Sequence, residues 1–352
     1  MIGVVSDPRF MDHDTGGYHP ESPMRIQYLH TLFARPDSGI MLTEPVCSTI
    51  EDILLNHGRS YIDSIARTAD SDAYTDLDPD TTCSRDSYIV SLLAAGSVVR
   101  LTEMALDHRI SAGFACVRPP GHHSMLVAHG ARGFCNINIE AVMVEYIRHT
   151  FGVRRIAIVD TDCHHGDGTQ DIYWNDPDVL CISMHQDGRT LYPGTGYIED
   201  FGGPNALGAT INIPLPPHTS DEGFLFALDN VILPILDEFK PEIIINSAGQ
   251  DNHYSDPITN MNFSAQGYAL LNEKLAPHIA VLEGGDTSGG LIDHDQVDGV
   301  EGSLSRQAMI SPATAGHPTW KLGTAAYSLT NAPRSASSRS PSTASVSTSS
   351  AG

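Results

Sequence analysis

The sequence has little positive charge and no obvious membrane span or leader. Only three of its 352 residues are lysine, and the formal net charge is −23. Phosphate backbones bind basic surfaces, so this balance argues against nucleic acid and favours cationic ligands, although solubility or life in salt explains it equally well. No apolar run approaches the roughly 20 residues that span a bilayer, and the first residues lack the regions of a signal peptide. We expect a cytoplasmic protein without a membrane partner.

The sequence contains cysteines but no Cys-x-x-Cys motif. Most of the cysteines lie in or beside apolar, strand-like runs, where a small buried thiol is the ordinary interpretation. The sequence therefore predicts neither disulfides nor a thiolate zinc site. The six residues concerned are Cys47, Cys83, Cys116, Cys135, Cys163 and Cys181.

The order of predicted elements indicates an α/β fold with a parallel sheet. The first 110 residues are expected to form a strand at 2–5, helices at 25–33, 51–69 and 86–106, and a polar loop at 76–80. Strand, polar loop and helix then alternate, with strands at 112–117, 156–159, 179–183, 243–246 and 279–282. This alternation is typical of parallel strands joined by crossover helices. In such sheets ligands bind outside the carboxyl ends of the strands, where these five polar or glycine-rich loops should meet.

The segment 156–168 has the densest set of chemically active side chains. Its apolar start is typical of a strand buried on both faces. Three carboxylates and two imidazoles follow, Asp160, Asp162, His164, His165 and Asp167. Buried groups of these kinds need one another or a metal as partners. Asp162 and His164 are two residues apart, so in extended chain they point to one side, as two ligands of one ion do.

Seven motifs in this order resemble those of the histone deacetylase superfamily, particularly its prokaryotic members that act on acetylated polyamines, acetyl-lysine or related amides. The motifs cover residues 1 to about 285. They are His19-Pro-Glu-x-Pro-x-Arg25, Arg118-Pro-Pro-Gly-His-His123, Gly133-Phe-Cys-x-x-Asn138, Asp160-x-Asp-x-His-His-Gly-Asp-Gly-Thr169, Tyr192-Pro-Gly-Thr-Gly196, Ser247-Ala-Gly-x-Asp251 and Leu282-Glu-Gly-Gly285.

The resemblance implies a three-layer α/β/α fold of the arginase–deacetylase type with a mainly parallel sheet. It also implies a metal held by Asp162, His164 and Asp251, usually zinc, with iron(II) as the alternative. Two carboxylates and one imidazole leave positions open for water and a substrate carbonyl, as a catalytic site requires. The sequence leaves the native metal and the oligomeric state open.

The resemblance further assigns the acid–base residues. Asp160 should orient His122, and Asp167 should orient His123, because a carboxylate on one ring nitrogen fixes the tautomer and basicity of the other. His123 is then the general base and acid, and His122 gives electrostatic support.

The remaining site residues implied by the resemblance form the substrate channel and a second ion site. Phe134, Tyr192, Gly284 and Gly285 belong to the narrow channel that holds the linear part of the substrate. Ser183, with backbone carbonyls near the metal ligands, matches the position of the family's potassium site. The partner implied is a small acylated amine or an acetyl-lysine peptide.

The pattern breaks at residue 286. The family has a tyrosine here that donates to the substrate carbonyl as it becomes an oxyanion, whereas this chain has Asp286. The resemblance stops there, and residues 291–352 form a divergent, low-complexity tail expected to be disordered. We therefore expect a metallohydrolase domain at 1–290 that lacks its last elements.

A one-base frameshift near codon 286 explains the lost tyrosine, the lost resemblance and the tail together. The last base of an aspartate codon and the first two of a threonine codon read TAC or CAC, which encode Tyr or His. Resequencing this region tests the hypothesis: an alternative frame without a tyrosine codon contradicts it.

Three functional interpretations follow, and they are given from the most to the least favoured. The first is a metal-dependent deacetylase that hydrolyses an N-acetyl amide. The second is an impaired relative that binds a metal and an acylated ligand without turnover, because of Asp286. The third is a ureohydrolase of the same fold, which uses two metals. Metal stoichiometry together with turnover distinguishes the three.

Overall fold

The computed structural model describes residues 1–36, 38–126 and 132–285. Its main sheet consists of β1 (Ile2–Val5), β2 (Met41–Thr43), β5 (Ala112–Ala115), β6 (Ile156–Asp160), β7 (Val179–Gln186), β8 (Thr210–Leu215), β9 (Ile243–Ala248) and β10 (Ile279–Leu282). The strand order is β2-β1-β5-β10-β9-β6-β7-β8, and each neighbouring pair is parallel. The predicted parallel sheet is therefore confirmed.

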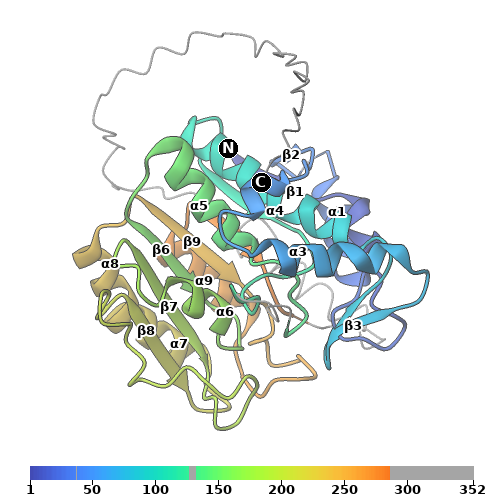
Figure 1. Ribbon diagram of the computed structural model, residues 1–352. Coiled ribbons are helices and arrows are strands. Elements are labelled where there is room, and N and C mark those ends of the chain that lie inside the picture. Colours follow the sequence, from blue (N-terminus) through green and yellow to red (C-terminus); the bar gives the residue numbers. More distant parts are fainter. Residues whose placement is uncertain (37, 127–131, 286–352) are drawn as a thin grey trace, which may run out of the picture. The chain divides into compact units, whose positions relative to one another are not determined.

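Helices cover both faces of this sheet (Figure 1). They are α1 (Met24–Phe33), α2 (Ile50–Ile53), α3 (Arg59–Ala66), α4 (Ser87–Leu106), α5 (Ile139–Phe151), α6 (Asp167–Tyr173), α7 (Asp221–Ala227), α8 (Leu233–Phe239) and α9 (Ala265–Leu275). Side chains alternate across a strand. In β6, Ile156 and Ile158 join the apolar cluster that includes α4 and α5, whereas Ala157 and Val159 join the cluster of α7, α8 and α9. The three-layer α/β/α prediction is confirmed.

Several local predictions are wrong in detail. The helix expected at 51–69 is divided into α2 and α3, because the chain turns between them at Gly58. The loop expected at 76–80 is part of an antiparallel hairpin of β3 (Thr75–Asp78) and β4 (Thr81–Cys83). Its aspartates masked the strand pattern, since Asp is depleted in strands. The boundary at 290 and the tail 291–352 lie outside the described residues.

Helix α4 corrects the expectation about apolar segments. Within the described part of the chain, α4 is the one helix whose length and composition would allow it to cross a membrane. However, 72% of that window is buried inside the protein. It packs mainly on α5 and also against β1, β5 and β10. A buried core helix passes the same test, so the finding is weak support for a membrane span.

A buried ion pair joins the N-terminal segment to the loop that follows strand β5. Arg118 is fully buried and donates from Nε and Nη2 to the two carboxylate oxygens of Glu21, at 2.7 Å each. Its Nη1 donates to the backbone oxygens of Phe10 and His13. Burial raises the pKa of Glu21, but the attraction of Arg118 outweighs it and holds that pKa well below its ordinary value. This network fixes the loop that precedes His122 and His123.

We expect Glu21→Gln to lower the free energy of unfolding by about 3–5 kcal/mol at pH 7, because it leaves the Arg118 charge buried and unpaired. The folded-state pKa of Glu21 is depressed, so its contribution is present above the unfolded pKa and is lost as the pH falls towards the folded value. The stability gap between wild type and variant should therefore shrink below about pH 4.5. Urea unfolding of both proteins at several pH values measures this gap. A gap that widens in acid contradicts an ionised Glu21 paired with Arg118.

Candidate active site

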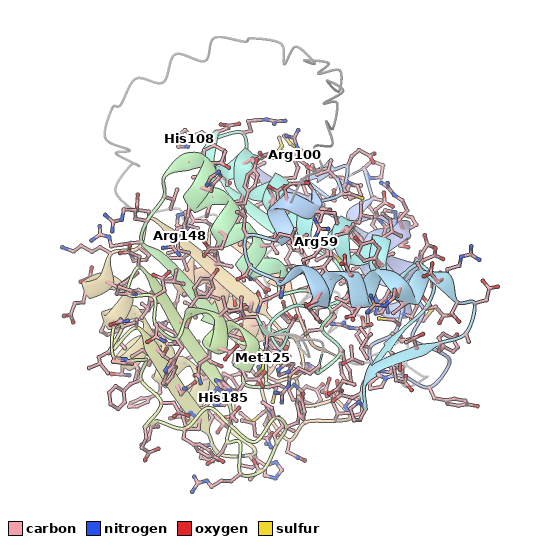
Figure 2. The ribbon with its side chains drawn as sticks, viewed as in Figure 1. Arg59, Arg100, His108, Met125, Arg148 and His185 are labelled. Atoms are coloured by element: carbon pink, nitrogen blue, oxygen red, sulfur yellow. The ribbon has the colours of Figure 1, made fainter. Side chains whose placement is uncertain are left out.

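The five predicted site loops meet at one edge of the sheet. They follow β5, β10, β9, β6 and β7, which are adjacent strands in that order. Since all five strands are parallel, their carboxyl ends emerge side by side. Figure 2 labels Met125, from the loop after β5, and His185, near the end of β7, at this side of the sheet. The fold therefore gathers residues that lie more than a hundred positions apart in sequence.

The three predicted metal ligands form one cluster. The ligand atoms of Asp162, His164 and Asp251 lie within 4.8 Å of one another. His164 Nδ1 is 2.7 Å from Asp251 Oδ2 and 3.2 Å from Asp162 Oδ1. Both carboxylates are fully buried. Backbone N–H groups hold their other oxygens, from Gly284 to Asp162 Oδ2 at 2.7 Å and from Cys163 to Asp251 Oδ1 at 2.8 Å.

This donor set fits a divalent ion. Two buried carboxylates beside one imidazole form a compact negative site, and such groups need a metal or a cation as partner. A second group, His122, Cys135 and Glu283, also lies within 4.8 Å. It fits less well, because it has one carboxylate in place of two to balance the charge of a divalent ion. One Glu283 oxygen is also occupied by two backbone N–H donors.

The tandem histidines have the predicted carboxylate partners. His122 Nδ1 is 2.9 Å from Asp160 Oδ2, and His123 Nδ1 is 2.7 Å from Asp167 Oδ1. Each carboxylate accepts the Nδ1 proton, which leaves Nε2 of each ring as the nitrogen that can exchange protons. The rings lie beside each other with centroids 4.1 Å apart, and the His123 and His164 centroids are 6.0 Å apart. The acid–base pair therefore adjoins the metal cluster.

The two histidines differ in their electrostatic surroundings. Burial lowers the pKa of His122, but attraction by Asp160 and Asp162 outweighs burial and holds it well above 6.5. Burial, followed by repulsion from His122, lowers the pKa of His123 to about 4 despite the Asp167 hydrogen bond. These surroundings favour the neutral form of His123 and the cationic form of His122.

Tyr192 and Phe134 are the aromatic residues predicted to form the channel walls, and that role stays a prediction. The Tyr192 ring lies edge-on to His123, with centroids 5.3 Å apart, and is 38% exposed. Phe134 packs edge-on against His19 at 4.8 Å. A residue that the sequence did not flag, Arg132, joins this wall: its Nε donates to the Tyr192 hydroxyl at 3.1 Å, and its Nη2 is 3.2 Å from Asp167 Oδ2. Only its position one residue before the Gly133 motif could have signalled it.

Gly284 and Gly285 close the site from β10. A Cβ atom on Gly284 would lie 2.6 Å from Asp162 Oδ2 and 2.7 Å from Asp251 Oδ2, closer than real Cβ atoms approach. Gly285 has φ +119°, a left-handed conformation that favours glycine. Arg25 donates to the backbone oxygens of Gly285, at 2.8 Å, and Glu283. Position 286, the predicted site of the missing tyrosine, lies outside the described residues.

We expect Gly284→Ala to weaken metal binding at least tenfold, because the new methyl group displaces two ligand carboxylates. A metal titration against a competing chelator measures the affinity. Gly17→Ala is the matched control, since nothing lies within 4 Å of a Cβ atom there. Unchanged affinity in Gly284→Ala contradicts the ligand assignment.

Ser183 lies where a monovalent cation is predicted. His185 Nε2 donates to the Gly196 backbone oxygen at 2.9 Å, so its Nδ1 accepts the Ser183 hydroxyl proton at 2.9 Å. The lone pairs of Ser183 Oγ therefore remain free for a cation. Ser183 and Asp160 line the same small cavity, of about 10 Å³.

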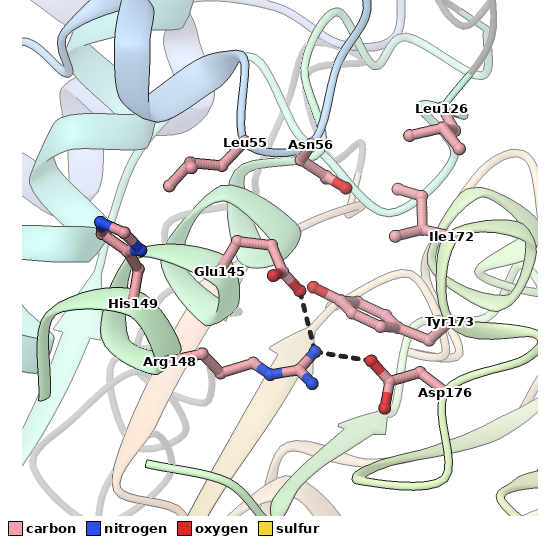
Figure 3. Close-up of a pocket in the computed structure, with 9 residues that line it drawn as sticks. All are labelled: Leu55, Asn56, Leu126, Glu145, Arg148, His149, Ile172, Tyr173 and Asp176. Atoms are coloured by element: carbon pink, nitrogen blue, oxygen red, sulfur yellow. Dashed lines mark hydrogen bonds and ion pairs between the residues drawn. The ribbon is translucent and has the colours of Figure 1, made fainter. Parts of the chain in front are cut away.

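A separate pocket of about 490 Å³ lies between α5 and α6 (Figure 3). Arg148 Nη1 lies between Glu145 Oε1, at 3.1 Å, and Asp176 Oδ2, at 2.6 Å. The charged groups of this pocket thus pair with one another. None of the residues that line it belongs to the predicted site.

Known proteins similar to this chain are found by sequence. The model of the histone deacetylase domain matches residues 19–291. A probable deacetylase of Archaeoglobus fulgidus is 38% identical over 309 residues, which cover 84% of this chain and 84% of the relative. A histone deacetylase-like amidohydrolase of Pseudomonas aeruginosa is 31% identical over 278 residues, covering 76% of this chain and 72% of the relative.

The fold has a similar counterpart among solved structures. The crystal structure of the HDA15 HD domain matches with a TM-score of 0.78 at 29% sequence identity. The match covers 86% of this chain and 88% of that domain. Sequence and fold therefore point to the same group of proteins.

Proposed function

The chain belongs to the histone deacetylase family, and from this membership we propose that it is a metal-dependent deacetylase that hydrolyses an N-acetyl amide to acetate and an amine. The hydrolase class follows from the family. The substrate class that we propose is an acetylated polyamine or an acetyl-lysine side chain, since the net charge of −23 attracts cationic amines.

One observation supports this proposal above the others. Asp162, His164 and Asp251 form a compact ligand cluster, and directly beside it lie two histidines with a carboxylate each. Zinc, or iron(II) as the alternative, would supply Lewis-acid chemistry there by polarising the amide carbonyl and acidifying a water. The donor set leaves positions open, as catalytic sites do.

The chain's own residues would then move the protons. Asp167 fixes the His123 tautomer through the 2.7 Å contact, so His123 Nε2 can take the proton of the attacking water and return it to the leaving amine. Asp160 holds His122 in the same way at 2.9 Å, and His122 supports the negative charge of the transition state. Phe134 and Tyr192 would exclude water from the linear part of the substrate.

A potassium ion is part of the proposal. Ser183 offers its oxygen lone pairs to the small cavity that Asp160 also lines. A cation there would stabilise the loop after β6, which carries the proposed metal ligands Asp162 and His164.

A substrate panel tests the proposed reaction. We expect acetate release from N-acetylputrescine and from an acetyl-lysine peptide, and no urea release from arginine, by the zinc-loaded full chain. Urea release with two metals per chain would instead support the ureohydrolase interpretation. One metal per chain without any turnover would support the second candidate, a ligand-binding relative, which Asp286 favours.

A further inference from the structure

Two glutamates are buried directly behind the tandem histidines. Glu140 lies in the first turn of α5, and Glu283 follows β10. Both are 0% exposed. Within the residues that the structure describes, neither forms an ion pair with lysine or arginine, and the mechanism above uses neither. A buried carboxylate without a cation is unfavourable, so this pair requires an explanation.

Only one of the four oxygens of the two carboxyl groups accepts a hydrogen bond from an N–H or hydroxyl donor among the described residues. Glu283 Oε2 accepts the backbone N–H of Gly121 at 2.8 Å and of His122 at 3.1 Å. Glu283 Oε1 and both oxygens of Glu140 have no N–H or hydroxyl donor among the described residues. Both carboxyl groups lie against the same residue, Gly121: Glu283 Oε2 accepts its N–H, and a Cβ atom on Gly121 would lie 2.8 Å from Glu140 Oε2. Two ionised carboxylates packed against one residue repel each other, whereas one proton between them removes one charge and links Glu283 Oε1 to one Glu140 oxygen.

We propose that Glu140 and Glu283 share one proton and that this pair acts as a positioning device for His122 and His123. The shared proton bonds Glu283 Oε1 to Glu140, while Glu283 Oε2 stays on the backbone of the tandem histidine loop. The pair carries one negative charge in place of two.

The pair joins three elements of the site. Glu283 holds the Gly121–His122 backbone from one side. The next residue, Gly284, donates to the ligand Asp162 at 2.7 Å. A Cβ atom on Gly121 would lie 2.8 Å from Glu140 Oε2, so α5 packs directly under the same loop. The spacing between the histidines and the metal ligands is thus set through Glu283.

Few other titratable groups face the pair. The His122 ring attracts Glu283, and the Cys135 thiol feels both glutamates but remains protonated. The Arg25 guanidinium reaches the backbone oxygen of Glu283. Burial first, and then the charge of Glu140, raises the pKa of Glu283 well above its ordinary value, and His122 only partly opposes this rise.

Infrared difference spectra of the full chain at neutral pH test the shared proton. We expect a protonated-carboxyl carbonyl band in wild type that disappears in Glu140→Gln and in Glu283→Gln, because the amide then supplies the hydrogen bond and the remaining glutamate ionises. Glu21→Gln is the control and should leave the band intact, since Glu21 is ionised beside Arg118. A band unchanged in both pair variants, as with a buried water as partner, overturns the proposal.

The pH dependence of unfolding gives an independent readout. A carboxyl with a raised folded pKa contributes stability that is complete below the unfolded pKa and is lost as the pH rises through the folded pKa. Glu140→Gln removes this loss, so it should raise Tm by about 2–4 °C at pH 9 relative to wild type and change it little at pH 5. Glu21→Gln should lower Tm at both values. Equal destabilisation by Glu140→Gln at pH 5 and pH 9 contradicts a shared proton.

The positioning role rests on the proposed function and has its own readout. Glu140→Gln should keep kcat within about threefold of wild type, whereas Glu140→Ala should lower kcat about tenfold or more with little change in KM, because the histidine loop loses its support. An equal loss in both variants contradicts positioning by hydrogen bonding. If wild type shows no turnover, the proposed function fails, while the infrared and Tm results still decide the shared proton.

Discussion

Asp286→Tyr should raise kcat for acetyl-lysine hydrolysis about a hundredfold or more. A tyrosine hydroxyl after Gly285 would donate to the developing oxyanion, whereas the carboxylate of Asp286 repels it. One such donor is worth roughly 10²–10³ in rate. Asp286 lies outside the described residues, but the two residues before it are placed at the ligands: Gly284 donates to Asp162, and Arg25 anchors the Gly285 carbonyl. Steady-state kinetics with saturating zinc measures the gain.

Asp286→Phe is the matched control for this prediction. It removes the negative charge and adds the ring but supplies no hydroxyl, so it should recover only a small part of the gain. Equal gains in the two variants show that removal of the charge, rather than an oxyanion donor, is responsible. No gain in either variant contradicts the prediction that a missing oxyanion donor limits activity.

Asp251→Ala should abolish stoichiometric metal binding and reduce turnover to background. The variant removes one of two buried carboxylates and leaves His164 Nδ1, now 2.7 Å from that carboxylate, with Asp162 alone. Loss of an outer partner costs roughly 10–100-fold in metal affinity, and loss of a ligand should exceed this. Elemental analysis after gel filtration should fall from one metal per chain to none.

Asp187→Asn controls for the loss of a negative charge near the site. Asp187 lies just beyond β7, at the same edge of the sheet, but pairs with Arg189 and is not in the ligand cluster. We expect it to bind metal as wild type does. Retention of one metal by Asp251→Ala would contradict the ligand set.

The sequence alone predicted most of the fold because apolar strands were followed directly by polar loops. The five strands with such loops prove to be neighbours, β5-β10-β9-β6-β7, so the inferred constellation was correct. Strand β8 was not predicted. It contains Asn212 and Pro214, which weaken a strand pattern and are tolerated at the edge position that β8 occupies.

The predicted histidine–carboxylate pairs and the predicted metal cluster lie close together. The contacts that support them from other loops and helices were not predictable from sequence. Arg132 reaches Asp167 from a different loop, and Glu140 in α5 lies against the same residue, Gly121, as Glu283 after β10. Neither contact leaves a spacing signature, because each depends on how α5 and the loops pack rather than on one motif. Sequence motifs therefore specify the reacting groups, whereas the supporting contacts require the fold.

The most direct test of the account is a zinc titration of the metal-free chain with acetate release from an acetyl-lysine reporter as readout. We predict that the rate rises with zinc and saturates at one equivalent, and that Asp251→Ala stays at background throughout. Saturation at two equivalents, or bound zinc with no acetate release by wild type or by Asp286→Tyr, would contradict a one-metal deacetylase site.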